Sequence, residues 1–110
     1  MIKRRWSLLI PFFLVTLAWS EPESRSVSGV VTDKRGNLLP GAVVQIDNTV
    51  TKQIQSFVVQ KDGHYHFHSL NPNIEFVMHA QYRGRKSKTW TLSKFSDAKD
   101  LRVDFVIPID

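Results

Sequence analysis

Hydrophobic and polar residues alternate along most of this chain after residue 26, in short runs separated by turn-forming residues. Alternation with a period of two places successive side chains on opposite faces of a strand, so each run predicts a strand with one face against a core. The runs predict strands over residues 27–32, 41–46, 53–60, 64–68, 74–82, 86–92 and 101–109. Residues 93–100 are mostly polar and are expected to form the one long connection, with room for a single helical turn.

Glycine, proline and asparagine mark the predicted turns. Gly36 or Asn37 can take a positive φ and Pro40 fixes its own φ, so the chain is expected to reverse between the first two strands. Asp62-Gly63, between two β-rich runs, predicts a hairpin with a two-residue type I′ loop, in which both residues have positive φ. Seven short strands and no helical pattern predict an all-β fold, a seven-stranded antiparallel Greek-key β-sandwich.

The first 20 residues differ from the rest of the chain. Lys3, Arg4 and Arg5 precede an apolar run over residues 8–19, and small residues at 18 and 20 occupy the positions that a signal peptidase reads. The run is shorter than the roughly 20 apolar residues that a membrane span needs. We therefore predict a signal peptide over residues 1–20, a flexible leader over 21–25 and one domain over 26–110. The protein is then exported, to the periplasm or the extracellular space.

Charge and cysteine content limit the classes of function. The chain has 15 basic and 10 acidic residues, and removal of residues 1–20 leaves 12 and 10, a net charge of +2. This balance lacks the concentrated basic face of a nucleic-acid-binding domain, so nucleic acid is not an expected partner. The chain has no cysteine, so its hydrophobic core must stabilise it without disulfides. After cleavage no membrane contact is expected, and the sequence leaves the oligomeric state open.

Three histidines on one face of a predicted strand, His64, His66 and His68, form the candidate metal site. Side chains two residues apart on a strand are about 6.5 to 7 Å apart, so a pair can converge on one ion but all three cannot. Zinc takes three or four ligands, so a pair would need a further ligand such as His79 or a carboxylate from a neighbouring strand. The alternative interpretation is an ordinary exposed polar face.

A basic and aromatic cluster around residue 86 forms the candidate ligand-binding site, with Tyr82, Arg83, Arg85, Lys88 and Trp90 as its residues. Aromatic residues and arginine are enriched at interfaces, where rings stack on ligands and cations hold acidic groups. The alternative is a solvated hairpin tip beside a tryptophan that belongs to the core. The chain has no nucleophile elbow, His-Glu-x-x-His motif or glycine-rich phosphate loop, so we predict no catalytic activity and no cofactor.

The segment SGVVTDKRGNLLPGAVVQI at residues 28–46, with KDGHYHFHSL and NPNIEF after it, resembles the carboxypeptidase regulatory-like domain. The resemblance covers residues 26–109 and implies a transthyretin-like, or prealbumin-like, sandwich of seven strands. Asn73 departs from the family pattern, which usually has glycine at this position. Residues 82–84 are Tyr-Arg-Gly and also depart from the pattern, which has Gly-Tyr near the end of this strand. The matching positions, which fix turns and core but include no catalytic residue, are Gly29, Val31, Asp33, Gly36, Pro40, Gly41, Ala42, Val44, Gly63, Tyr65, Phe67, Leu70 and Pro72.

Such domains often accompany peptidases, outer-membrane receptors and sugar-binding proteins, and their grouping with carbohydrate-binding folds rests on fold alone. We predict an exported, non-catalytic module that binds or structurally supports a protein or a polysaccharide at the cell surface. Recognition would use an edge strand or the loops at one end of the sandwich. The alternatives are a small carbohydrate-binding or metal-binding protein, and an accessory to a separately encoded exported enzyme.

Overall fold

A computed structural model describes residues 24–110, which contain nine β-strands and no helix. The strands are β1 Arg25–Thr32, β2 Val43–Asn48, β3 Ile54–Val58, β4 His64–Leu70, β5 Phe76–Tyr82, β6 Arg85–Lys86, β7 Trp90–Leu92, β8 Asp100–Arg102 and β9 Phe105–Val106. The predicted signal peptide lies outside the described residues. Within residues 24–110 no helix is long and apolar enough to span a membrane.

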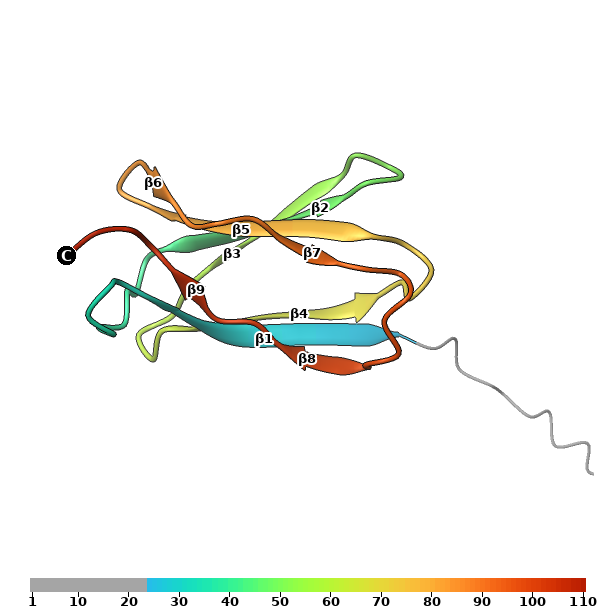
Figure 1. Cartoon of the computed structure of the whole chain (residues 1–110), viewed down its shortest axis with the longest axis horizontal. Coiled ribbons are helices and arrows are strands. Elements are labelled where there is room, and N and C mark those ends of the chain that lie inside the picture. Colours follow the sequence, from blue (N-terminus) through green and yellow to red (C-terminus); the bar gives the residue numbers. More distant parts are fainter. Residues whose placement is uncertain (1–23) are drawn as a thin grey trace, which may run out of the picture.

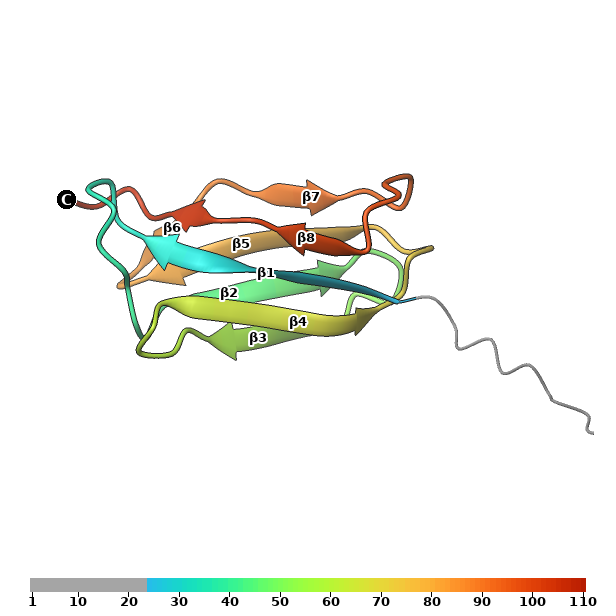
Figure 2. The same cartoon turned by 90° about the horizontal axis from the view of Figure 1, so that it is seen from below.

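The strands form two sheets that pack face to face (Figures 1 and 2). One sheet has the order β4-β1-β8, and β9 also pairs with β1. The other has the order β3-β2-β5-β6, and β7 also pairs with β5. The predicted all-β sandwich is therefore confirmed. The connection over residues 93–99 contains no helical turn.

Two of the seven predicted strands are interrupted, which accounts for the nine segments. β6 and β7 both pair with β5 and are separated by residues 87–89. β8 and β9 both pair with β1 in one continuous register, with Ser26 opposite Asp100 and Thr32 opposite Val106. The sandwich thus has seven strand positions, as the alternation of the sequence predicts.

The direction of the last strand differs from the prediction of an antiparallel sandwich. β8 and β9 run parallel to β1, whereas the other strand pairs of the two sheets are antiparallel. The reason is that the chain reverses at each of the connections between successive strand positions. The strands at the first and seventh positions therefore point the same way. Because these two positions are neighbours in one sheet, they form a parallel pair.

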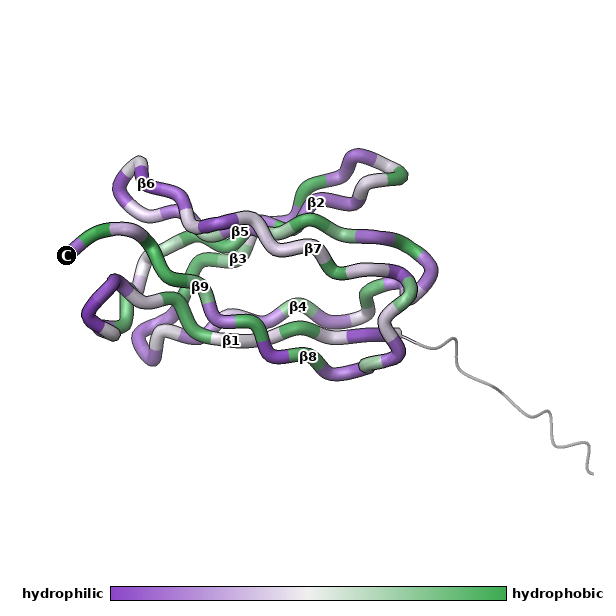
Figure 3. Tube along the Cα trace, viewed as in Figure 1, coloured by the Kyte–Doolittle hydropathy of each residue, from purple (hydrophilic) through white to green (hydrophobic). Residues whose placement is uncertain are grey.

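The core lies between the sheets, and the predicted alternation supplies it. Figure 3 shows hydrophobic and hydrophilic residues alternating along the strands, and the hydrophobic set faces inward. Among the described residues the only buried charged side chains are Arg25 and Asp33. The buried apolar residues are Val27, Val31, Leu39, Ala42, Val44, Ile46, Val59, Tyr65, Phe67, Leu70, Phe76, Met78, Ala80, Leu92, Val103, Phe105 and Ile107.

The turn at Asp62-Gly63 is present, but the predicted type I′ hairpin is wrong. β3 pairs with β2 and β4 pairs with β1, so the turn joins strands of different sheets. Gly63 has a φ of 76°, whereas Asp62 is not among the residues with positive φ. The Gly63 N–H donates to the carbonyl of Gln60, which closes the turn. The sequence marks the reversal but not the partner strands, because both kinds of connection use the same turn residues.

A two-residue loop with both residues at positive φ joins β5 to β6 instead. Arg83 and Gly84 have φ of 49° and 78°, and the flanking Tyr82 and Arg85 are paired in the ladder. This geometry is that of a type I′ hairpin. Arg83 and Arg85, two residues of the basic and aromatic cluster, therefore lie at a tight hairpin tip.

Arg25, the last residue of the predicted leader, begins β1 with a buried side chain. Its guanidinium donates to the carbonyl oxygens of Ser93 at 2.8 Å, Ile74 at 3.3 Å and Ser96 at 3.4 Å. A buried charge is tolerated where such acceptors surround it. Because these carbonyls come from distant segments, the sequence gives no sign that they would surround an arginine.

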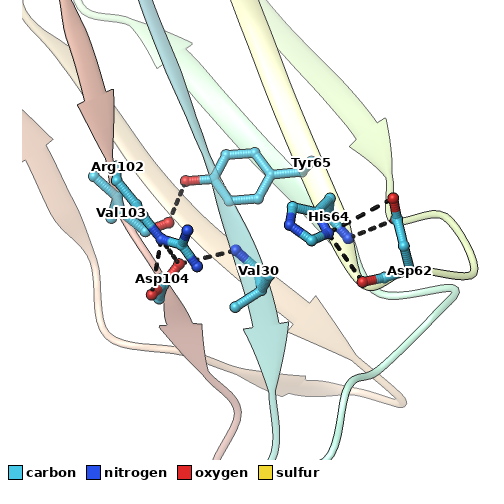
Figure 4. Close-up of polar contacts among 7 residues, drawn as sticks. All are labelled: Val30, Asp62, His64, Tyr65, Arg102, Val103 and Asp104. Atoms are coloured by element: carbon cyan, nitrogen blue, oxygen red, sulfur yellow. Dashed lines mark hydrogen bonds and ion pairs between the residues drawn. The ribbon is translucent and has the colours of Figure 1, made fainter.

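The break between β8 and β9 is stabilised by a tyrosine that crosses β1 (Figure 4). In an unbroken parallel ladder the Val30 N–H would donate to the Val103 carbonyl. Here the Val30 N–H donates to the Asp104 carboxylate at 3.0 Å, and the Tyr65 hydroxyl donates to the Val103 carbonyl at 2.6 Å. Tyr65 lies directly opposite Gly29 of β1, and the ring can cross there because glycine has no side chain. Burial raises the pKa of Tyr65, which keeps the hydroxyl protonated as a donor.

Candidate functional site: a basic groove between two interrupted edges

A groove of about 630 Å³ lies between the interrupted edge strands of the two sheets. Both interruptions line it, with residues 87–89 on one side and Val103 and Asp104 on the other. Lys34, from the turn after β1, also lines the groove. Three segments that are far apart in the sequence therefore form one surface.

The sequence-predicted ligand cluster is divided by the structure. Lys88 and Trp90 line the groove. Arg85 lies beside it, because its guanidinium donates to the Pro108 carbonyl at 3.3 Å. Tyr82 packs against the core, and the Arg83 guanidinium lies 5.1 Å from the centre of its ring at the hairpin tip. Of the five predicted residues, two line the groove and a third contacts a residue that does.

The groove combines an apolar surface with three cations. Trp90, Phe105 and Val106 supply apolar contacts, and the Val106 side chain is 52% exposed. Lys34, Lys86 and Lys88 also line the groove, and within residues 24–110 none of these lysines is in an ion pair. The carboxylate of Asp104 is already occupied by Val30 and Arg102. The groove is therefore suited to an anionic chain with apolar groups.

Trp90 is half-buried rather than fully exposed. It is paired with Met78 of β5 and packs against the core, so much of its ring is covered by protein. A sugar-binding platform needs a ring face that is open to solvent. The sequence allows Trp90 to belong to the core or to a binding surface, and the structure places it partly against the core and partly at the groove.

Sequence reasoning missed the part of the groove that comes from other segments: Lys34, Val103, Asp104, Phe105, Val106 and Pro108. The alternation had assigned Phe105 to the core, where it is also buried. Residues 103–108 lie beside residues 86–90 because the last strand docks on β1 at the edge nearest β6 and β7. If the chain reverses between each two of seven successive strands, the last strand must run parallel to the first. Nothing in the sequence gives the register of the last strand against β1.

The three histidines of β4 are exposed on one face, as predicted, but they do not form one cluster. The rings of His66 and His68 are 4.5 Å apart between centroids. His64 turns toward the preceding turn, where its Nδ1 is 3.0 Å from the Asp62 carbonyl oxygen (Figure 4). In the part of the chain that the structure describes, no group of three or more His, Cys, Asp or Glu side chains could hold a metal ion. Of the three rings, only those of His66 and His68 contact each other.

His79, a candidate for the further metal ligand, does not lie near the β4 histidines. It is on the outer face of β5, opposite Gln45 of β2, whereas β4 belongs to the other sheet. The outer faces of the two sheets point in opposite directions, so His79 cannot join the β4 pair. Burial, and to a smaller extent the charge of Lys86, lower the pKa of His79, whose Nε2 is buried without a hydrogen-bond partner among the described residues.

Comparison with known proteins adds a family and a fold. The family model described as carboxypeptidase regulatory-like domain matches residues 26–108. Among curated protein sequences none matches this chain. The fold is similar to that of several solved structures, all of low sequence identity.

The C-terminal domain of the shaft pilin SpaA from Lactobacillus rhamnosus GG has a TM-score of 0.54 and 10% identity, over 79% of this chain and 98% of that one. A DUF3823 family protein from Parabacteroides merdae has a TM-score of 0.55 and 16% identity, over 80% of this chain and 47% of that one. The dioxygenase domain of a dioxygenase carbohydrate-binding protein fusion from Streptomyces sp. SirexAA-E has a TM-score of 0.59 and 15% identity, over 94% and 97%. Similarity at this identity shows the fold alone.

Proposed function

The chain belongs to the carboxypeptidase regulatory-like domain family, and from this premise we propose that it is an exported, non-catalytic module that binds an acidic segment of a partner protein. The segment would lie extended in the groove between the interrupted edges. The observation that carries the proposal is the combination of three lysines that lack ion pairs within residues 24–110 with the apolar surface of Trp90 and Val106.

The edges of the groove favour a polypeptide over other anionic chains. Edge strands carry backbone N–H and C=O groups without partners on their outer side, and an extended peptide can pair with them. The interruption at residues 87–89 leaves part of this edge outside the regular ladder with β5. Apolar side chains of the bound segment would contact Val106 and the open part of Trp90, while its acidic side chains would face the lysines.

A polysaccharide partner is less well supported by the groove. Recognition of sugars commonly relies on aromatic faces, and the ring of Trp90 is partly covered by the core. The export in this proposal rests on the predicted signal peptide at residues 1–20. The proposal of a non-catalytic role is supported by the lack of catalytic motifs in the sequence and by the family positions that match, none of which is a catalytic residue.

Titration of the protein with poly-L-glutamate at low salt tests the proposal, with Trp90 fluorescence as the readout. Trp90 is the only tryptophan that remains if cleavage occurs after Ser20. The double variant Lys86→Glu/Lys88→Glu is expected to bind at least about tenfold more weakly, because two attractive contacts become repulsive. The matched control is Lys61→Glu/Lys94→Glu, which changes the net charge equally at exposed sites outside the groove.

Three results would contradict the proposal. The first is an absence of any fluorescence change with poly-L-glutamate. The second is an equal loss of affinity in both double variants, which would indicate attraction by net charge alone. The third is tighter binding of polygalacturonate than of poly-L-glutamate, which would favour an acidic polysaccharide as the ligand.

A further inference from the structure

β3 is an edge strand with an unusual composition. It pairs with β2 on one side, and on the other side no strand among the described residues pairs with it (Figure 2). None of its five residues is charged, and Ile54 and Val58 are 57% and 56% exposed. Natural edge strands are usually protected by lysine, proline or a bulge, because an unprotected edge can pair with another chain. Lys52 and Lys61 lie outside the strand and limit the unprotected stretch to β3 itself.

The backbone groups of β3 that are free to pair follow from its ladder with β2. Asn48 N–H donates to Gln53 at 2.9 Å and Val59 N–H donates to Ala42 at 2.8 Å, so residues 53 and 59 face β2. In an antiparallel ladder this orientation alternates, so residues 55 and 57 also face β2. The N–H and C=O groups of residues 54, 56 and 58 therefore point away from the sheet. Of these outward groups, only the Val58 carbonyl has a partner within residues 24–110, the side chain of Gln60 at 2.9 Å.

We propose that β3 binds β3 of a second copy of this chain, antiparallel and around a two-fold axis at Ser56. Ser56 then lies opposite the partner's Ser56, and Ile54 lies opposite the partner's Val58. The facing pairs are 54 with 58, 56 with 56 and 58 with 54, and the backbone groups of all these residues point outward. Each pair can exchange two hydrogen bonds, with the Val58 carbonyl accepting one in addition to that from Gln60. The two five-stranded sheets join into one continuous sheet across the dimer.

Self-pairing fits β3 better than the pairing of β3 with an unrelated strand. The five residues are self-complementary, because reversal about Ser56 places one exposed apolar side chain against another on the same face. Val43 of β2 is paired with Val58, so it adds another apolar side chain next to the contact between Val58 and the partner's Ile54. A two-fold contact occupies the open edge of β3 in both copies. No open β3 edge is then left for a third copy, so the assembly stops at a dimer.

The neighbouring edge β4 is less suited to such pairing. Phe57 of β3 lies against it, with its ring 4.8 Å from that of His66. The opposite edges carry charges, with Arg85 and Lys86 in β6 and with Asp100 and Arg102 in β8. Since a single strand pair buries less than the roughly 1,200 Å² of a standard interface, the dimer is expected to be weak and concentration dependent.

Sedimentation velocity of the protein over a range of concentrations up to millimolar tests the inference. The wild type is expected to shift from monomer to dimer. Ser56→Lys places two like charges directly across the two-fold axis, and is expected to weaken the dimer at least about tenfold. Ser56→Glu is expected to do the same. An equimolar mixture of the two variants should form a heterodimer, because opposite charges then face each other.

The control is Thr91→Lys, which adds the same charge at an exposed position of β7 on the other edge of the same sheet. It should dimerise like the wild type. Because Ser56 is exposed, circular dichroism should show that its variants remain folded. A wild type that stays monomeric at every concentration, a Ser56→Lys variant that dimerises normally, or a mixture without heterodimer would each overturn the inference. Lys86→Glu/Lys88→Glu should leave dimerisation unchanged, so the dimer and the groove fail independently.

Discussion

Tyr65→Phe removes a single hydroxyl from the point where the last strand is broken. That hydroxyl donates to the Val103 carbonyl at 2.6 Å, and both residues are buried. The ring contacts with Phe67 and Phe105, with centroids 6.0 and 5.8 Å apart, should persist in the variant. A buried carbonyl left without a donor costs about 1–3 kcal/mol. In a domain of this size, about 2 kcal/mol corresponds to a fall of roughly 10 °C in the midpoint of thermal unfolding.

Thermal and urea unfolding followed by circular dichroism measures this loss. Tyr82→Phe is the matched control, because it removes the same atom from a half-buried tyrosine whose hydroxyl makes no hydrogen bond in the described structure. The control should shift the free energy of unfolding by less than about 0.5 kcal/mol. If the two variants lose the same stability, the hydroxyl of Tyr65 does not compensate for the interrupted ladder, and our account of the break is wrong.

Three further predictions concern other positions. Gly29→Ala should destabilise the fold more than Tyr65→Phe does, because an added Cβ would overlap the Val103 carbonyl oxygen, and its unfolding midpoint should lie well below that of Tyr65→Phe. Because burial lowers the pKa of His79, stability should fall as the pH drops below about 6.5, and His79→Gln should remove this part of the pH dependence in urea unfolding at several pH values. Arg25→Met should leave the Ile74 carbonyl without a donor and remove the shorter of two hydrogen bonds to the Ser93 carbonyl, which keeps the one from the Ser96 N–H, and trypsin should then cleave faster at Lys94 than in the wild type.

The sequence predicts the strands well because burial in a sandwich has a period of two. Leu101, Val103, Phe105 and Ile107 alternate as expected, and the last three are buried. Alternation contains no information on direction or partners, however. The parallel closure on β1 and the separation of β3 and β4 into different sheets therefore appear only in the structure.

The candidate site was predictable only where its residues are close in the sequence. Lys88 and Trp90 are two residues apart and are recognisable as a cluster, whereas Lys34 and Val106 join them through the register of β1 with β9. Register depends on the summed packing of both sheets and on special positions such as Gly29. The exposed apolar residues of β3 were visible in the sequence, but an imperfect alternation gave no indication that they lie on an open edge.

The parallel pairing of the first and last strands has a mechanical consequence. β1 begins at one end of the sandwich and the C-terminus lies at the other (Figure 1). A pulling force between these two points would slide β1 along β8 and β9 rather than peel them apart. The hydrogen bonds of that ladder would then bear the load together, and the domain would resist extension until they broke as a group.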